Sequence, residues 1–145
     1  AGRGAGASRP VFAGRAPVFD ALVIHDDMVT RLPPDCTVLA SNAWSPVQAA
    51  EMRAGRGVFW AVQYHPEYNL YELARLIALN TERLVAQGYA ADNAAVRRFI
   101  DTLDALHVAP MRKDLRWQLG VDEEIVNEAC REREFANWLR AFVRP

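Results

Sequence analysis

The spacing of apolar positions changes near residue 67. Before that point, short apolar or alternating runs predict strands at 18–24, 36–41, 47–53 and 58–64. The last run, VFWAVQY, is apolar on both faces, which is typical of a central strand that helices cover on both sides. The first part of the chain is therefore predicted to form a sheet.

After residue 67 the apolar positions recur with the helical period of 3.6 residues. Asn69 can cap the first helix, with Glu72 at the reciprocal position of a capping box. Gly88 is a natural end for this helix. The pattern therefore predicts one helix over 69–88.

Three more helical segments follow. One begins at Asp92 and stops before Pro110, a short one covers 115–119 and ends at Gly120, and the last begins near Asp122. The side chains expected to face inward are Val96, Phe99, Ile100, Leu103, Leu106, Ile125, Ala129, Phe135, Trp138, Leu139 and Phe142. Strands followed by helices predict an α/β fold.

Composition is that of an ordinary globular domain. The 145 residues carry a net charge of -1, so neither nucleic acid nor an anionic membrane is expected as a partner. No apolar stretch approaches the roughly 20 residues of a membrane helix. Cys36 and Cys130 make no disulfide framework or zinc pattern, which predicts a reducing, cytoplasmic setting.

The start of the chain lacks any strand or helix period. AGRGAGASRP is rich in glycine and alanine and is predicted to be a loop. Residue 1 is alanine and the first methionine is Met28, inside a patterned segment. We expect the chain to have been cut from something longer, or processed.

A histidine and a carboxylate lie where the last predicted strand gives way to a helix. Pro66 disfavours helical backbone in the preceding residue, so His65 is expected to be extended. His65 and Glu67 can then project to one side, where the carboxylate accepts a hydrogen bond from one imidazole nitrogen and leaves the other facing the crevice beyond the strand ends. This suits a general base with its orienting acid. On spacing alone, a solvated glutamate beside an idle histidine is the more common arrangement.

A second group of ionisable residues ends the first predicted strand. His25, Asp26 and Asp27 follow the apolar run and precede a loop. Two strand ends can meet at one crevice, where open α/β sheets bind ligands. The alternative is a turn that is rich in aspartate because aspartate suits turns.

Three motifs stand in order along the chain. The pattern H-x-D-x-V-x-x-L-P runs from His25 to Pro33, VLASNAWSPVQAAEMR follows it, and FWAVQYHPE ends at Glu67. Together they resemble the C-terminal half of a class I glutamine amidotransferase domain, as in GMP synthase and its stand-alone bacterial relatives. The opening AGRGAGASRPVFAGR also resembles the segment that precedes these motifs in bacterial members.

The resemblance implies a fold and a division of the chain. It is close over roughly residues 9–80 and weaker in the tail, which is similar to the C-terminal extension of some stand-alone bacterial members. Residues 1–88 are then expected to be the C-terminal part of a flavodoxin-like amidotransferase sheet. Residues 89–145 are expected to be an α-helical extension packed on it.

The resemblance also implies a reaction. A cysteine thiolate attacks the side-chain amide of glutamine, which gives a glutamyl thioester and ammonia, and water then releases glutamate. His65 and Glu67 match the catalytic histidine and glutamate of the family, while Gln63 and Tyr64 match the strand leading in, with a structural role. No cofactor or metal is implied. An ammonia-accepting synthase is an implied partner.

The stretch that helps form the glutamine pocket departs from the family pattern. The family has S-H-G-D at this place, and the expected substrate-binding residues here are Ile24, His25, Asp26 and Asp27. Ile24 and Asp26 therefore stand where the family has a small serine and a glycine.

The nucleophile of the family has no counterpart in the sequence. That cysteine belongs to a G-x-C-x-G elbow, whereas Cys36 begins a strand without flanking glycines and Cys130 lies in a charged helical segment. We expect a fragment of a longer amidotransferase, or a chain that needs a complementary half. The chain alone is predicted to have no glutaminase activity.

Two other functions stay open on the sequence. One is a metal-dependent hydrolase with zinc or manganese held by His25, Asp27, His65 and Glu67. Their spacing matches no compact metal signature. The other is a non-catalytic helical interaction protein, with a docking surface of Trp117, Trp138, Phe142 and Val143. Those residues fall at core spacing, which favours packing within the domain.

Overall fold

A computed structural model describes residues 9–143, which divide into two compact units. Residues 9–67 and 129–143 belong to the first unit, and Tyr68–Glu128 form the second. The two ends of the described chain therefore belong to the same unit. Residues 1–8, most of the predicted opening loop, lie outside the described residues.

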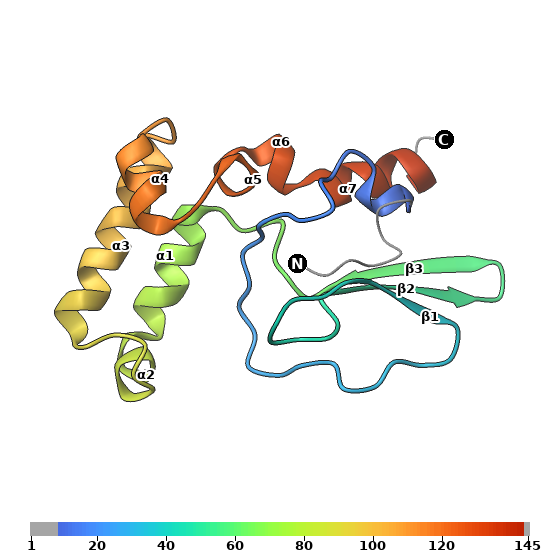
Figure 1. The fold of residues 1–145 in the computed structure, drawn as a ribbon, viewed down its shortest axis with the longest axis horizontal. Coiled ribbons are helices and arrows are strands. Elements are labelled where there is room, and N and C mark those ends of the chain that lie inside the picture. Colours follow the sequence, from blue (N-terminus) through green and yellow to red (C-terminus); the bar gives the residue numbers. More distant parts are fainter. Residues whose placement is uncertain (1–8, 144–145) are drawn as a thin grey trace. The chain divides into compact units, whose positions relative to one another are not determined.

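The first unit contains a three-stranded antiparallel sheet (Figure 1). Its strands are β1 (Cys36–Ala40), β2 (Ala49–Ala54) and β3 (Gly57–Val62), in the order β1-β2-β3. A tight turn joins β2 to β3, and Gly55 in that turn has a φ of 57°, which glycine adopts without a steric penalty. The strands predicted within 36–41, 47–53 and 58–64 are confirmed, with ends shifted by a few residues.

Two predictions about the sheet are wrong. Among the described residues, the segment 18–24 forms no strand, although the amide of His65, beyond the end of β3, donates to Leu22 O at 2.8 Å. One bond cannot build a ladder. β3 is also not central: it pairs with β2 alone at the edge of the described sheet, and Phe59 is 58% exposed.

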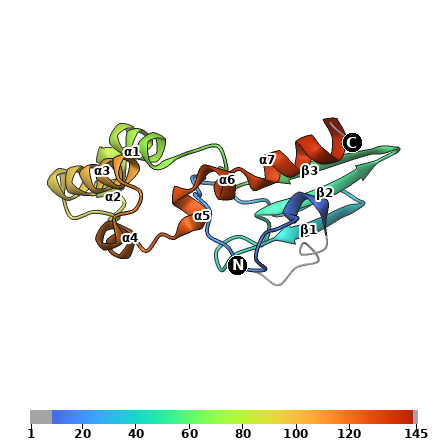
Figure 2. The same cartoon turned by 90° about the horizontal axis from the view of Figure 1, so that it is seen from above.

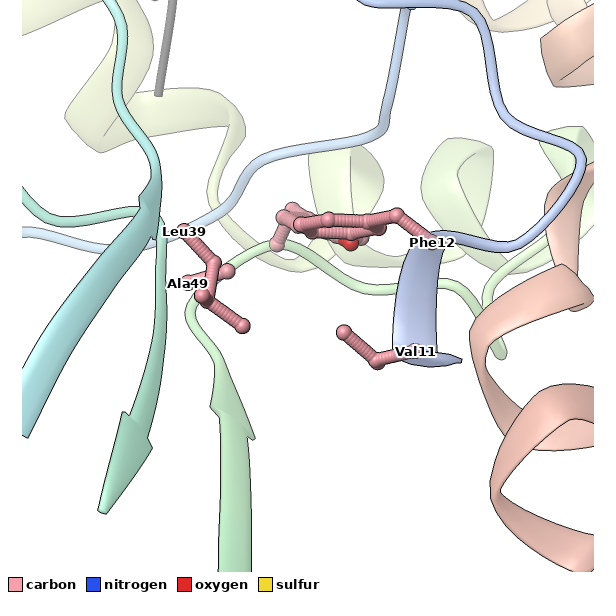
Figure 3. Packing of buried hydrophobic residues seen from close by; sticks show 5 residues of the cluster. Val11, Phe12, Leu39 and Ala49 are labelled. Carbon is pink, nitrogen blue, oxygen red and sulfur yellow. The ribbon is translucent and has the colours of Figure 1, made fainter. Parts of the chain in front are cut away.

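The core of the first unit joins the strands to the segment that precedes them. Val11 and Phe12 come from a short 3-10 helix, η2 (Pro10–Phe12), and pack with Leu39, Ala49 and Tyr64 (Figure 3). Burying a side chain of this size stabilises a fold by about 1.5–3 kcal/mol. Tyr64 therefore anchors the chain in the core one residue before His65.

The second unit is helical. Its elements are α1 (Leu70–Leu79), α2 (Thr81–Ala86), α3 (Asn93–Val108), α4 (Lys113–Leu119) and α5 (Glu123–Val126). α1 and α3 lie side by side (Figure 1) and bury apolar residues that include Ala74 and Leu106. The Asn69–Glu72 capping box at the start of α1 is present as predicted. None of the helices within 9–143 has the length and apolar character to cross a membrane.

The helical predictions are wrong in detail. The predicted helix over 69–88 is interrupted at Asn80, which separates α1 from α2. In α3, Val96, Leu103 and Leu106 are buried as expected, but Phe99 is 45% exposed. α4 ends before Gly120 as predicted. The φ of 65° at Gly120 suits a glycine at a helix end.

The last predicted helix is broken into short pieces with an unexpected inner face. α6 (Glu128–Arg131), α7 (Arg133–Trp138) and the π-helical turn η3 (Leu139–Val143) follow α5, and α7 runs alongside the sheet of the first unit (Figure 2). Phe135 and Trp138, expected inside, are 56% and 42% exposed, whereas Glu134 and Asn137 are buried. The reason is that polar groups of residues 11–15 face α7 and need hydrogen-bond partners.

Candidate functional site

His65 and Glu67 form the contact that their spacing predicts. The imidazole Nδ1 lies 2.8 Å from Glu67 Oε1, so Nδ1–H can donate to the carboxylate. The side chain of His65 is 28% exposed and that of Glu67 is 60% exposed. A polar contact this exposed contributes little to stability. Its plain effect is to orient the imidazole ring.

The second ring nitrogen of His65 is not turned toward open solvent. Nε2 lies 3.3 Å from the carbonyl oxygen of Ile24. Both ring nitrogens thus face an acceptor oxygen, and a neutral imidazole can donate to only one of them. The expectation that the second nitrogen points into a crevice is therefore corrected: it faces the backbone of the segment 22–27.

The structure brings the two predicted clusters together along that segment. The amide of His65 donates to Leu22 O at 2.8 Å, and Gln63 Nε2 donates to Asp27 O at 2.9 Å. The side chains of Asp26 and Asp27 are exposed, and Ile24 is 38% exposed. Although 22–27 is not a strand, hydrogen bonds from the end of β3 hold it beside His65.

One residue of this site was not predicted from the sequence. The carboxamide Nε2 of Gln48 lies 3.1 Å from His25 Nε2, and the residue is 5% exposed. Gln48 directly precedes β2, and its carbonyl accepts from the amide of Gln63 at 2.8 Å. Gln48 lies opposite Gln63 across the hairpin. The sequence gives no sign of this pairing, because it depends on the strand register.

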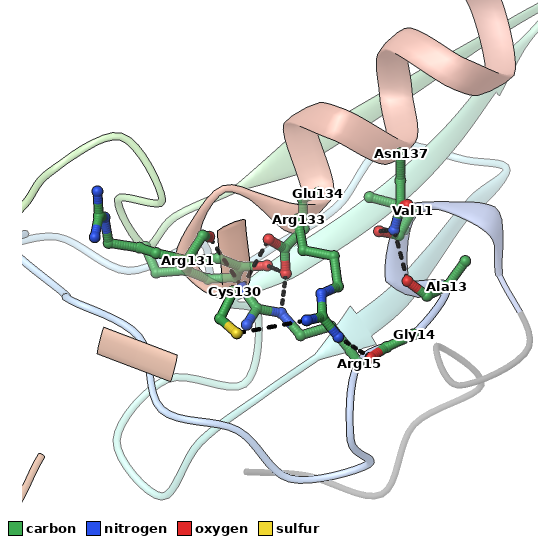
Figure 4. A network of polar contacts seen from close by, with 10 residues as sticks. Val11, Ala13, Gly14, Arg15, Cys130, Arg131, Arg133, Glu134 and Asn137 are labelled. Carbon is green, nitrogen blue, oxygen red and sulfur yellow. Dashed lines mark hydrogen bonds and ion pairs between the residues drawn. The ribbon is translucent and has the colours of Figure 1, made fainter. Parts of the chain in front are cut away.

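A buried polar network fixes Tyr64, the residue before His65. Arg15 donates to both carboxylate oxygens of Glu134, through Nε and Nη2, at 2.8 Å each (Figure 4). The hydroxyl of Tyr64 donates to Glu134 Oε1 at 2.9 Å. From the same helix, Asn137 Nδ2 donates to the carbonyls of Val11 and Ala13. These contacts tie α7 both to the N-terminal segment and to the strand end that carries the site.

We expect Tyr64 to make the stability of the first unit pH-dependent above about pH 10, the ordinary tyrosine pKa. Burial raises the pKa of the Tyr64 phenol, and the charge and hydrogen bond of Glu134 raise it further. Because the folded state holds this proton more tightly, its contribution is complete below the ordinary pKa. It is lost as the pH rises above that value.

The measurement is the free energy of unfolding, obtained from urea titrations of the chain and of Tyr64→Phe between pH 8 and 11. The difference between the two should stay constant up to about pH 10 and then shrink, by up to roughly 1.4 kcal/mol per pH unit. Other titrating groups cancel in this difference. Two curves that remain parallel through pH 11 would contradict the prediction.

The four residues proposed as metal ligands are not gathered into one site. Within residues 9–143 no three His, Cys, Asp or Glu side chains come together as a metal-binding group. The hydrolase alternative with zinc or manganese bound by His25, Asp27, His65 and Glu67 therefore has no geometric support. A metal site needs convergent ligands at short distances.

Neither cysteine has the surroundings of an exposed nucleophile on an elbow. Cys36 is the first residue of β1, and Cys130 lies on α6 with its sulfur 3.6 Å from Arg133 Nη2. Both are partly buried and neither forms a disulfide. The segment that follows β3 instead carries His65 and Glu67.

Known proteins resemble the part of the chain that contains this site. The sequence profile of the family described as "Glutamine amidotransferase class-I" matches residues 3–81. A gamma-glutamyl-L-1-hydroxyisopropylamide hydrolase from Pseudomonas is 39% identical over 83 residues, which cover 57% of this chain and 28% of that protein. No solved structure matches the chain.

Two GMP synthases give shorter matches. In Ignicoccus hospitalis, one subunit of the glutamine-hydrolyzing GMP synthase is 34% identical over 70 residues, covering 48% of this chain and 36% of that protein. The GMP synthase of Nitrosomonas eutropha is 41% identical over 51 residues, 35% of this chain and 9% of that protein. The chain thus covers 36% or less of the length of each of these relatives. Because the family profile covers more than half of the chain, the chain belongs to the class I glutamine amidotransferase family.

Proposed function

We propose that this chain supplies the base and the orienting acid of an enzyme that hydrolyses the side-chain amide of glutamine. The observation that carries the proposal is the 2.8 Å contact between His65 Nδ1 and Glu67 Oε1 at a strand end. The family membership of residues 3–81 supports it, since this region contains both residues. In this arrangement Glu67 orients the ring and stabilises the imidazolium that forms when Nε2 takes up a proton.

The proposed reaction uses a cysteine that this chain does not provide. The thiol gives its proton to His65 Nε2 and its sulfur attacks the amide carbon of glutamine. The C–N bond breaks as His65 returns the proton to the departing nitrogen, which leaves as ammonia. Water then attacks the thioester with His65 as base, and the products are glutamate and the regenerated thiol. For Nε2 to act, its contact with the Ile24 carbonyl must be displaced.

The remaining parts of the proposal follow the family resemblance. The segment Ile24, His25, Asp26 and Asp27 lines the glutamine pocket, and its place beside His65 supports this role. Residues 1–88 are the C-terminal part of a flavodoxin-like amidotransferase sheet, and residues 89–145 are a helical extension. A complementary half carries the G-x-C-x-G elbow, and β3 offers it one of the two edges of the described sheet.

The acceptor of the ammonia is a separate question from the hydrolysis. One relative is named as a hydrolase of a γ-glutamyl amide, and others are named as GMP synthases. A γ-glutamyl amide bond is common to these reactions. We therefore propose a γ-glutamyl amide as the substrate class, with glutamine as its first member and a synthase as the partner that takes up the ammonia.

The test is glutamate release from glutamine and from a γ-glutamyl alkylamide. The chain alone, at high concentration, should release none. Mixed with the N-terminal half of a class I amidotransferase that contains the cysteine elbow, it should give turnover that His65→Ala abolishes. Turnover by the chain alone that disappears in His65→Ala would overturn the missing-nucleophile proposal. A mixture that assembles but never releases glutamate would overturn the function.

A further inference from the structure

Two glutamines at the ends of β2 and β3 face the segment 24–27. Gln48 and Gln63 lie opposite each other, since the amide of Gln63 donates to Gln48 O and the next pair in register is Ala49 with Val62. Directly opposed residues of antiparallel strands project from the same face. Both carboxamides therefore reach the same stretch of chain.

Each carboxamide contacts a different polar group of that stretch. Gln63 Nε2 donates to the backbone carbonyl of Asp27 at 2.9 Å, and Gln48 Nε2 lies 3.1 Å from the ring nitrogen Nε2 of His25. The segment has no strand or helix of its own to order it. The two glutamines hold it by hydrogen bonds from the strand ends, and the backbone amide of His65 donates to Leu22 O just before it.

These glutamines are poorly suited to stability alone. The side-chain oxygens Oε1 of Gln48 and Gln63 are buried, and within residues 9–143 neither has a hydrogen-bond partner. A buried acceptor without a donor costs free energy, whereas an apolar side chain of similar shape does not. His25 is only partly buried, so without Gln48 its ring could bond to water. The presence of carboxamides at these two positions is better explained by their hydrogen bonds to the segment 24–27.

We propose that Gln48 and Gln63 are positioning residues that fix the segment 24–27 beside His65. The inference rests on the proposed function, in which this segment lines the glutamine pocket. It assigns the two glutamines no contact with the reacting atoms. Their effect is to keep His25 and the Asp27 backbone in one arrangement.

The test uses Gln48→Met and Gln63→Met, which keep the length of the side chain and remove its amide. Arg31, exposed and four residues beyond Asp27, provides a trypsin site that reports opening of the segment. Each variant should speed cleavage after Arg31 about fivefold relative to cleavage after Arg56 in the hairpin turn, the change expected for one net hydrogen bond. The thermal unfolding midpoint should stay unchanged or rise.

Gln118→Met is the matched control, because Gln118 is exposed on α4 and the same substitution there should alter neither quantity. Unchanged cleavage after Arg31 in both site variants would overturn the proposal. So would a fall in the unfolding midpoint with faster cleavage at every site, since that result describes a purely structural role.

A spectroscopic signature tests the Gln48 contact separately. With the Gln48 amide donating to His25 Nε2, neutral His25 should carry its proton on Nδ1, which ring ¹⁵N chemical shifts report. In Gln48→Glu the carboxylate accepts instead, so the proton should move to Nε2. The same tautomer in the chain and in Gln48→Glu would contradict the contact. These measurements need no glutaminase activity, so failure of the proposed function and failure of this inference are separate results.

Discussion

Glu134→Ala is expected to lower the free energy of unfolding of the first unit by about 3–5 kcal/mol. The side chains of Arg15 and Glu134 are 2% and 5% exposed, and Glu134 accepts hydrogen bonds from both Arg15 and Tyr64. Alanine would leave the guanidinium charge buried beside an unpartnered phenol. The contact of Arg15 with the face of the Phe19 ring, 4.6 Å from its centroid, cannot replace a carboxylate.

Urea unfolding followed by circular dichroism and tryptophan fluorescence measures this effect. Asp114→Asn is the control, because the Arg112–Asp114 pair is also an ion pair but its side chains are 51% and 62% exposed. Its loss should cost below about 1 kcal/mol. The double variant Arg15→Met, Glu134→Leu should recover most of the stability, since it removes both charges at once. A loss for Glu134→Ala no larger than that of the control would show that the network does not hold the unit together.

Glu67→Gln is expected to reduce glutamate release by the reconstituted enzyme on the order of 10²–10⁴-fold. A carboxamide can still accept from His65 Nδ1–H, but it lacks the negative charge that stabilises an imidazolium. If its NH₂ group faces Nδ1 instead, the ring carries its proton on the wrong nitrogen. Because Glu67 is exposed, the unfolding midpoint should hardly change.

The assay compares kcat/KM of the two proteins after mixing each with the half that carries the cysteine elbow. Glu82→Gln, an exposed position on α2, is the matched control and should retain full activity. A Glu67→Gln enzyme with more than half of the original kcat/KM would remove Glu67 from the proposed mechanism. Loss of assembly in this variant would likewise contradict a purely chemical role.

The local parts of the site could be predicted because they depend on neighbours in sequence. His65 and Glu67 are two residues apart and Pro66 restricts the backbone between them, so their hydrogen bond needs little help from the rest of the fold. The capping box of Asn69 and Glu72 is local for the same reason. Such features follow from short-range geometry.

The sheet edges and the inner face of α7 could not be predicted in this way. The run VFWAVQY is apolar enough for a central strand, but whether a strand is central depends on which other segments pair with it. The aromatic side chains of α7 likewise fit a buried face by composition. That face is exposed because Glu134 and Asn137 satisfy polar groups of residues more than 100 positions away in the chain.

The sequence by itself determined the family motifs, the His65–Glu67 pair and the change from strands to helices near residue 67. These follow from residue identity, apolar period and the constraints of proline. Only the tertiary structure decided that 22–27 lies against His65, that Gln48 and Gln63 hold it, and that Glu134 anchors Tyr64. Each of these contacts joins residues 23 to 70 positions apart. The pattern of residues along the chain does not predict such pairings. Strand register and the hydrogen-bond partners of buried polar groups are decided only when the whole unit packs.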